Sequence, residues 1–117
     1  MLLITGGTGF VGRNLTETLI RKGRDVRLLC LPGEEVGNLH EKADIVRGDI
    51  TKPDTLRDAV RGVGTVVHLA GLVSYSKPKA MLYGVNAAGT KNLISKCGRV
   101  KRFVFASSVS VYGEIRG

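Results

Sequence analysis

Three glycines near the start of the chain constrain its fold more than any other feature. Gly6, Gly9 and Gly12 come directly after a short apolar run and before a stretch with apolar residues at every fourth position. Their spacing fits G-x-x-G-x-x-G and, counted from Gly7, also G-x-G-x-x-G. In a turn from strand to helix, this spacing lets bare backbone N–H groups approach an anion at the positive end of the helix, and a Cβ at Gly9 would hold the anion away. The placement of the motif therefore predicts a cradle for the pyrophosphate of a dinucleotide.

Short apolar segments alternate with longer amphipathic segments along the chain. The short ones are rich in Leu or β-branched residues and end at Gly, Pro, Asp or Ser, as strands do. Predicted strands are Leu2–Thr5, Val26–Cys30, Asp44–Arg47, Thr65–Leu69 and Phe103–Ser107, and predicted helices are Phe10–Lys22, Thr51–Arg61 (with Thr51 as N-cap of a capping box and Asp54 at N3) and Ser76–Cys97. Because the strands are apolar on both faces, this order predicts an α/β fold, a Rossmann-type doubly wound parallel sheet of about five strands with flanking helices.

The chain is long enough for one domain, and its charge is unevenly distributed. Of its 117 residues, 43% are hydrophobic and 24% are charged, which is typical of a globular domain. Residues 1–60 hold nine basic and nine acidic side chains, whereas residues 61–117 hold nine basic side chains and one acid, Glu114, so the net charge of +8 comes from the second half. Solvated helix faces, a missing acidic continuation or a nucleic-acid-binding face would each explain this excess. We expect no nucleic-acid partner, because Trp is absent and aromatic residues make up only 5%.

The amino terminus and the two cysteines bear on location and redox chemistry. The chain opens Met1-Leu2-Leu3-Ile4 without a basic segment, and no apolar run approaches the roughly 20 residues of a membrane span. These features favour a soluble, cytoplasmic protein without a membrane partner. Cys30 and Cys97 are isolated, with no CxxC or Cys/His cluster, so we expect free buried thiols, no disulfide scaffold and no metal site.

Five segments of the chain carry short motifs. In order, they are Thr5–Gly12, Gly48-Asp49-Ile50 (G-D-hydrophobic), His68–Gly71 (H-L-A-[AG]), Asn86–Thr90 (N-x-x-G-T) and Phe103–Gly113 (the Ser strand with its V-Y-G turn). In this order they resemble the motifs of the extended short-chain dehydrogenases/reductases, a group that includes nucleotide-sugar epimerases/dehydratases and dihydroflavonol-reductase-like enzymes. Together they cover nearly the whole chain. The resemblance implies that residues 1–117 are the amino-terminal portion of an NAD(P)-binding domain, truncated before the substrate domain.

The resemblance also implies a set of cofactor-binding residues and one catalytic residue. The glycine turn and its neighbour contribute Gly6, Thr8, Gly9, Phe10, Val11, Gly12 and Arg13, and the later segments contribute Asp49, Ile50, Leu69, Ala70, Gly71, Asn86 and Ser107. By family position Asp49 contacts adenine, Ile50 lies beside that ring and Ser107 lines the cofactor. Ser108 is the implied catalytic residue, since the serine at this position in the family hydrogen-bonds the substrate oxygen.

Several of these residues also have a purely structural interpretation. Asp49 could cap the turn before Thr51. His68 invites a catalytic interpretation, but it lies in an apolar run, which favours a buried, hydrogen-bonded structural histidine. Asn86 could be an ordinary polar helix residue, and the two serines could simply form the turn after their strand.

The choice between NAD and NADP depends on the residues that follow the second strand. An acid about 20 positions after the glycines accepts from the adenosine ribose of NAD, whereas a nearby Arg accommodates the 2′-phosphate of NADP. Here the strand ends Leu29-Cys30-Leu31-Pro32, without an acid. Arg13 could meet a 2′-phosphate, and Glu34 or Glu35 could reach a ribose from the loop. The missing acid and the presence of Arg13 favour NADP, and the choice stays open.

The family's catalysis needs a Tyr-x-x-x-Lys pair on a helix after the Ser strand. Tyr75 and Lys79 have this spacing, but they precede that strand and Pro78 lies between them, and Tyr112 with Arg116 is a weaker match. We therefore expect the pair beyond Gly117 and an inactive 117-residue piece. The full-length protein is expected to be a homodimeric NAD(P)-dependent oxidoreductase or epimerase/dehydratase, using hydride transfer on a sugar nucleotide or related alcohol or ketone. The alternative is a non-catalytic NAD(P)-sensing or interaction module with the same fold.

Overall fold

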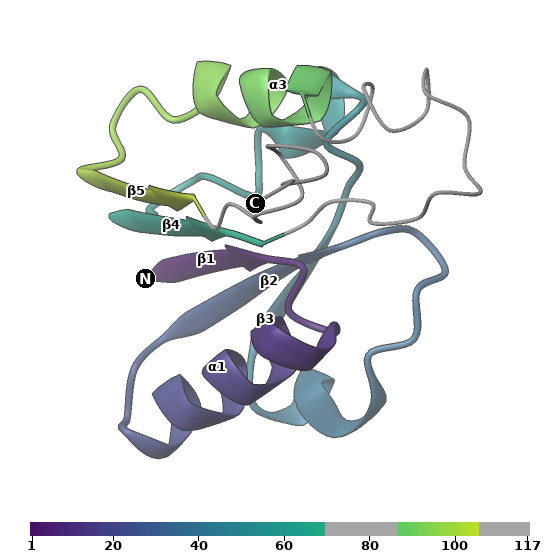
Figure 1. Cartoon of the computed structure of the whole chain (residues 1–117), viewed down its shortest axis with the longest axis vertical. Coiled ribbons are helices and arrows are strands. Elements are labelled where there is room, and N and C mark those ends of the chain that lie inside the picture. The colour runs from purple at the N-terminus through teal and green to yellow at the C-terminus, as the bar shows by residue number, and fades with distance from the viewer. Residues whose placement is uncertain (70–86, 106–117) are drawn as a thin grey trace, which may run out of the picture.

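A parallel sheet forms the centre of the computed structural model, which describes residues 1–69 and 87–105 (Figure 1). Its strands are β1 (Leu2–Thr5), β2 (Val26–Cys30), β3 (Asp44–Arg47), β4 (Thr65–His68) and β5 (Arg102–Phe105). They lie in the order β3-β2-β1-β4-β5, and in the central pairs Ile4 is in register with Leu28 and Val67. This is the doubly wound arrangement that the sequence predicts, with β1 at its middle.

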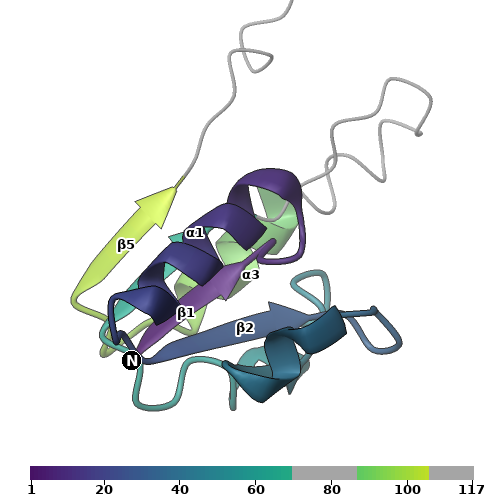
Figure 2. The same ribbon diagram turned by 90° about the horizontal axis from the view of Figure 1, so that it is seen from below.

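Helices cover both faces of the sheet. On one face lies α1 (Phe10–Arg21), with the 3-10 helix η1 (Gly37–Glu41), and on the other lie α3 (Gly89–Ser95) and the 3-10 helix η2 (Pro53–Leu56) (Figures 1 and 2). The end of α1 matches the sequence prediction to within one residue. Gly23 has φ +76° there, a conformation that favours glycine, and its N–H donates to the Ile20 carbonyl.

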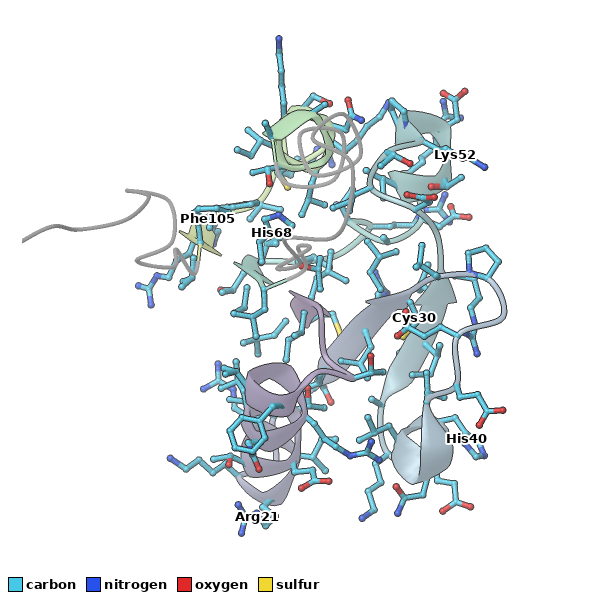
Figure 3. The ribbon with its side chains drawn as sticks, turned by 45° about the vertical axis from the view of Figure 1, so that its right-hand side comes forward. Arg21, Cys30, His40, Lys52, His68 and Phe105 are labelled. Carbon is cyan, nitrogen blue, oxygen red and sulfur yellow. The ribbon has the colours of Figure 1, made fainter. Side chains whose placement is uncertain are left out.

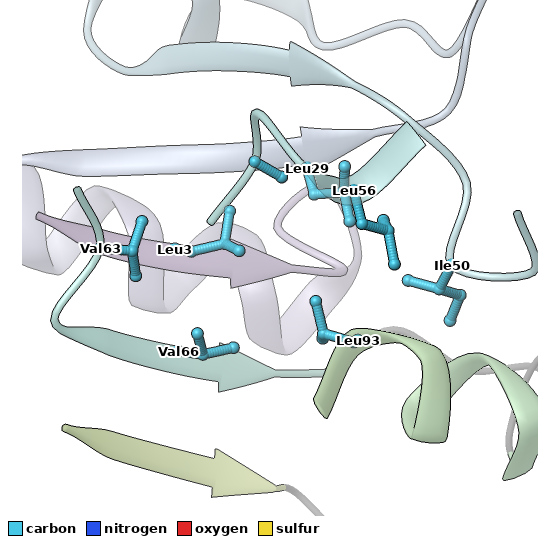
Figure 4. Close-up of a cluster of buried hydrophobic side chains, with 8 residues drawn as sticks. Leu3, Leu29, Ile50, Leu56, Val63, Val66 and Leu93 are labelled. Carbon is cyan, nitrogen blue, oxygen red and sulfur yellow. The ribbon is translucent and has the colours of Figure 1, made fainter. Parts of the chain in front are cut away.

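Two clusters of buried apolar side chains lie on the two sides of the sheet. The cluster under α3 and η2 comprises Leu3, Leu29, Ile50, Leu56, Ala59, Val63, Val66 and Leu93 (Figure 4). The cluster under α1 and η1 comprises Ile4, Val26, Leu28, Cys30, Val36 and Leu39. Leu3 and Ile4 are neighbours in β1 and point to opposite clusters, which explains why this strand is apolar at both alternating positions.

The predicted helix Thr51–Arg61 is wrong in its length and its cap. The structure has only η2 in this region, with Lys52 at the N-cap and no side-chain capping bond. The Thr51 hydroxyl donates instead to Asp49 Oδ1 at 2.7 Å, and the Thr55 hydroxyl donates to the Lys52 carbonyl at 2.7 Å. Short polar side chains that bond the nearby backbone compete with helical hydrogen bonds, so a tight turn replaces the longer helix.

The third predicted helix, Ser76–Cys97, is described only at its end, where α3 runs from Gly89 to Ser95. Gly89 and Leu93 are buried on the face that the spacing predicts. Cys97 follows the helix, and its thiol donates to the Leu93 carbonyl at 3.1 Å. Cys30 is buried and Cys97 half-buried, both thiols are free, and burial raises the pKa of each. Within residues 1–69 and 87–105 we find no helix with the length and apolar character needed to cross a membrane.

Candidate functional site

The glycine turn joins β1 to α1 at the carboxyl edge of the sheet. Gly6 has φ +74°, which a glycine adopts without strain. The Gly9 N–H donates to the Gly6 carbonyl at 3.2 Å, and the Arg13 N–H donates to the Gly9 carbonyl at 2.7 Å, which starts α1. Gly9 is the N-cap, and α1 has neither a side-chain cap nor an acidic residue in its first turn. The positive end of α1 is therefore left for another anion.

The glycines of the motif have different reasons to be glycine. A Cβ at Gly12 would overlap the Gly6 carbonyl oxygen and lie 2.8 Å from Gly7 Cα, and a Cβ at Gly7 would lie 2.6 Å from Leu28 Cδ2. These two positions are glycine because the turn packs closely on itself and on β2.

Gly9 is different, because a Cβ there would meet only the Gly6 carbonyl oxygen, at an ordinary contact distance of 3.5 Å. Its φ of −74° is open to any residue, so the protein itself does not require a glycine. Without a side chain at Gly9, the backbone of the turn is open at this position. This observation fits the pyrophosphate cradle that the sequence predicts.

The exposed apolar residues of this turn are the next two in sequence. Phe10 is 86% exposed and Val11 is 64% exposed, although both are large and apolar. They begin α1 immediately beside the open backbone of Gly9. The structure thus places both predicted cofactor-binding residues at the same turn as the glycines.

Glu34 lies in the loop after β2, and its carboxylate contacts the glycine turn. The segment Leu31-Pro32-Gly33-Glu34 forms a tight turn, in which Gly33 has φ +82° and the Glu34 N–H donates to the Leu31 carbonyl at 3.0 Å. The turn directs the Glu34 carboxylate back to the glycine loop, where Oε2 accepts from the Thr8 hydroxyl at 2.7 Å and Oε1 from the Leu31 N–H at 3.3 Å. The Pro-Gly pair was the sequence signal that could have singled out Glu34 over Glu35.

Arg13 lies on the side of α1 that faces η1. Its Nε is 3.6 Å from Glu17 Oε1, and its Nη2 would lie 3.2 Å from a Cβ at Gly37. Arg47 lies across the same loop and donates from Nη1 to the carbonyls of Leu31 and Glu34 at 2.9 and 2.6 Å. The loop after β2 is thus held in place by Arg47, and Arg13 is engaged with a carboxylate of its own helix.

Asp49 caps the turn before Thr51, as the structural interpretation expects. Its Oδ1 accepts from the Thr51 N–H at 2.9 Å and from the Thr51 hydroxyl at 2.7 Å. The hydroxyl bond, with the Thr51 N–H bond and the nearby Lys52, lowers the pKa of the Asp49 carboxyl. Among the hydrogen bonds of the described residues none uses Oδ2, so the capping role leaves one carboxylate oxygen for a ligand.

Ile50 has a different environment from its neighbour Asp49. Its side chain is 7% exposed and packs in the apolar cluster with Leu56 and Leu93 (Figure 4). The Ile50 carbonyl accepts from Asn92 Nδ2 of α3 at 2.9 Å. The sequence analysis did not single out Asn92, although a polar residue beside the buried Leu93 was a signal that it bonds within the fold.

His68 is the buried structural histidine that the sequence analysis favours. It is fully buried, and burial lowers the pKa of its ring. Nδ1 lies 2.6 Å from the Thr5 hydroxyl and Nε2 lies 2.8 Å from the Thr90 hydroxyl, while Phe105 lies beside the ring (Figure 3). The network joins the ends of β1 and β4 to α3, so His68 supports the edge of the sheet that carries the glycine turn.

Of the remaining predicted site residues, the structure describes Leu69. Leu69 is half-buried against the cluster under α1, and its N–H donates to the Thr5 carbonyl at 3.1 Å. Five predicted site residues, Ala70, Gly71, Asn86, Ser107 and Ser108, lie outside the described residues, as do Tyr75, Lys79, Tyr112 and Arg116. In the part of the chain that the structure describes, no group of three or more His, Cys, Asp and Glu side chains is arranged to hold a metal ion.

The family comparison and the curated relatives agree with this geometry. The model of the NAD dependent epimerase/dehydratase family matches residues 2–117. A 3-beta-hydroxysteroid dehydrogenase from Mycolicibacterium neoaurum is 35% identical over 119 residues, which cover 94% of this chain and 32% of the relative. The decarboxylating sterol-4-alpha-carboxylate 3-dehydrogenase of Mus musculus is 33% identical over 113 residues, which cover 95% of this chain and 30% of the relative. The chain spans about a third of the length of these relatives.

Two solved structures show the same fold. A short-chain dehydrogenase/reductase superfamily protein from Agrobacterium tumefaciens, crystallised with bound NAD, has a TM-score of 0.83 and 34% identity, covering 99% of this chain and 35% of that chain. The UDP-glucose 4-epimerase of Thermotoga maritima, crystallised with UDP-glucose, has a TM-score of 0.85 and 28% identity, covering 99% of this chain and 40% of that chain. These matches confirm the predicted Rossmann-type fold.

Proposed function

We propose a function for this chain, which belongs to the NAD-dependent epimerase/dehydratase family. It forms the cofactor-binding part of an NAD(P)-dependent oxidoreductase or epimerase/dehydratase. The observation that carries the proposal is the open backbone at Gly9, where neither conformation nor packing requires a glycine. Gly6, Gly9 and the first turn of α1 would hold the pyrophosphate. The bound nicotinamide would supply hydride transfer.

Other residues of the chain would bind the adenine and the substrate at the carboxyl edge of the sheet. Asp49 would accept from the adenine amino group through Oδ2, because Oδ1 is used by Thr51. Ser108 would donate a hydrogen bond to the reacting oxygen of a secondary alcohol or ketone and so orient it. We propose a sterol-like or sugar-nucleotide substrate, in keeping with relatives and neighbours named for hydroxysteroids, sterols and UDP-glucose.

The test is turnover by the full-length chain that contains this sequence. It would be incubated with NAD or NADP and either a 3-beta-hydroxysteroid or UDP-glucose. Reduced nicotinamide is followed by absorbance, and epimerised sugar by chromatography. We expect one substrate class to react, with Ser108→Ala lowering kcat by about 100-fold or more. Dinucleotide binding without turnover of either class would instead favour the sensing module.

Between the two cofactors, the geometry around Glu34 supports NAD. The Thr8 hydroxyl and the Leu31 N–H hold the carboxylate at the end of β2, where an acid accepts from the adenosine ribose of NAD. A 2′-phosphate at the same place would face this negative charge. The competing candidate for NADP, Arg13, has Glu17 beside it. We therefore propose NAD, against the preference for NADP that the sequence alone suggests.

Replacing Glu34 by glutamine tests this choice without changing the side chain's size. The loss of the charged acceptor is expected to weaken NAD binding by about tenfold or more. The preference for NAD over NADP should become smaller or reverse. Calorimetry on the full-length chain gives the ratio of the two dissociation constants. Glu35→Gln is the matched control, because Glu35 is adjacent and exposed. An unchanged ratio in Glu34→Gln, together with a loss of NADP binding in Arg13→Ala, would return the preference to NADP.

The same proposal includes the oligomeric state of the protein and its location in the cell. We propose a cytoplasmic homodimer with a small-molecule substrate. Val104 and Phe105 of β5, which are 45% and 52% exposed, are large apolar side chains available for contact with further protein. Light scattering of the full-length chain would measure its mass in solution.

A further inference from the structure

A cavity of about 620 Å³ lies at the amino edge of the sheet. Its walls are the segment before β4, residues 57–64, and the segment between α3 and β5, residues 96–101. The connection from α3 to β5 lies at the opposite end of the strands from the turn between β1 and α1 (Figure 1). The cavity is therefore separate from the proposed dinucleotide site.

Positive charge surrounds this cavity. Its cationic lining residues are Arg57, Arg61, Lys96, Arg99 and Lys101. Asp58 pairs with Arg61 at 2.8 Å, and among the ion pairs of the described residues none involves the other four cations. Like charges gathered around one hollow repel one another, and a bound anion would relieve that repulsion. Part of the excess of basic residues in the second half of the sequence is therefore located at this cavity.

The cations are not needed to satisfy the backbone of the cavity wall. Arg27 of β2 donates from Nη1 to the carbonyls of Asp58, Ala59 and Arg61 at 3.3, 2.9 and 2.7 Å, and Asp44 pairs with its Nε at 2.8 Å. This one side chain thus contacts three carbonyls within the segment. The remaining cations are left to face the cavity and solvent.

Two glycines of the cavity lining have no structural reason to be glycine. Gly62 has φ +73°, which accounts for its identity, but neither Gly64 nor Gly98 has a positive φ or any heavy atom within 4 Å of a Cβ placed on it. The Gly64 carbonyl accepts from the N–H groups of Lys101 and Arg102 at 2.9 and 3.1 Å, so the two walls are joined. As at Gly9, a missing side chain leaves the backbone open to a ligand.

We propose that this cavity binds a compact polyanion, a small molecule that carries two or more linked phosphate groups. Its volume is within the range of about 300–1,000 Å³ that small-molecule sites occupy, whereas a surface for nucleic acid would need extended grooves and stacking side chains. Arginine suits phosphate because its planar fork donates two parallel hydrogen bonds. The cavity is also lined by three apolar side chains, Val60, Val63 and Val100.

The experiment is a calorimetric titration of the full-length chain with inorganic tripolyphosphate, in the presence of saturating NAD. We expect saturable binding that weakens as salt is added, and at least about tenfold weaker binding by the double variant Arg57→Gln/Arg99→Gln. Gly98→Leu should weaken binding similarly, because it adds a bulky side chain to the lining of the cavity without changing the charge. The matched control is Arg21→Gln/Lys91→Gln, which removes one exposed Arg and one exposed Lys that do not line the cavity. It should leave the affinity within about twofold.

Five results would overturn the proposal. Four are no saturable binding by the parent protein, equal weakening in the control, unchanged binding in Gly98→Leu, and tighter binding of a single-stranded oligonucleotide than of tripolyphosphate. The fifth comes from a variant of the glycine turn. The titration is repeated on Gly9→Val, where the dinucleotide site is blocked. Unaltered tripolyphosphate binding there would support a separate cavity, and its loss would assign the binding to the glycine turn. Thermal melting of each variant checks that it is folded.

Discussion

Replacing Gly9 by valine in the full-length chain is expected to abolish NAD binding while the protein stays folded. The φ of −74° at Gly9 suits valine, and a Cβ there meets its nearest heavy atom, the Gly6 carbonyl oxygen, at 3.5 Å. The branched side chain would instead occupy the space of the pyrophosphate. Losing the backbone hydrogen bonds to the charged pyrophosphate, each worth about 1.5–3 kcal/mol, is expected to cost about 100-fold or more in affinity. Calorimetry with NAD measures the binding, and circular dichroism measures the fold.

The matched variant for Gly9→Val is Gly12→Ala, in the same motif. A Cβ at Gly12 would overlap the Gly6 carbonyl oxygen, so even one methyl group must displace the turn from α1. We expect Gly12→Ala to lower the free energy of unfolding by about 1–3 kcal/mol, whereas Gly9→Val should change it by less than about 1 kcal/mol. If Gly9→Val keeps the affinity of the parent for NAD, the pyrophosphate does not lie against this turn.

The strands could be predicted from the sequence because each depends on a local pattern. Leu2–Thr5, Val26–Cys30 and Asp44–Arg47 are observed with the predicted bounds, and Thr65–Leu69 is observed one residue shorter. Runs of apolar residues closed by turn formers are sufficient here, since both faces of the sheet are covered. The order of the strands then follows from short connections and right-handed crossovers.

The features that the sequence did not predict depend on competition between several possible local hydrogen bonds. Thr51 had two partners within reach, the start of a helix and Asp49, and its hydroxyl bonds Asp49. Glu34 lies in the loop beyond the end of the second strand at Cys30, and its carboxylate contacts the glycine turn at Thr8 because Pro32 and Gly33 turn the chain back. The NADP preference rested on the missing acid at the end of the second strand and on the presence of Arg13, and neither argument takes that turn into account.

The expected loss on replacing Leu93 by alanine tests how α3 is held to the sheet. This helix has 7 residues, too few to be stable in isolation, so packing must hold it. Leu93 is completely buried in the cluster with Leu3, Ile50 and Val66. Leu→Ala at such a site costs about 2–5 kcal/mol in the free energy of unfolding. Urea unfolding of the full-length chain, followed by circular dichroism, measures this change.

Ile94 provides the control within the same helix. It is 53% exposed, so Ile94→Ala removes a similar volume from the exposed part of α3 and should change the free energy of unfolding by less than about 0.5 kcal/mol. Leu93→Ala should also weaken NAD binding, because the neighbouring Asn92 holds the Ile50 carbonyl and, through it, the Asp49 turn. Equal destabilisation by the two variants would mean that both faces of α3 are covered in the full-length protein, which would make the exposed face an interface rather than a solvated surface.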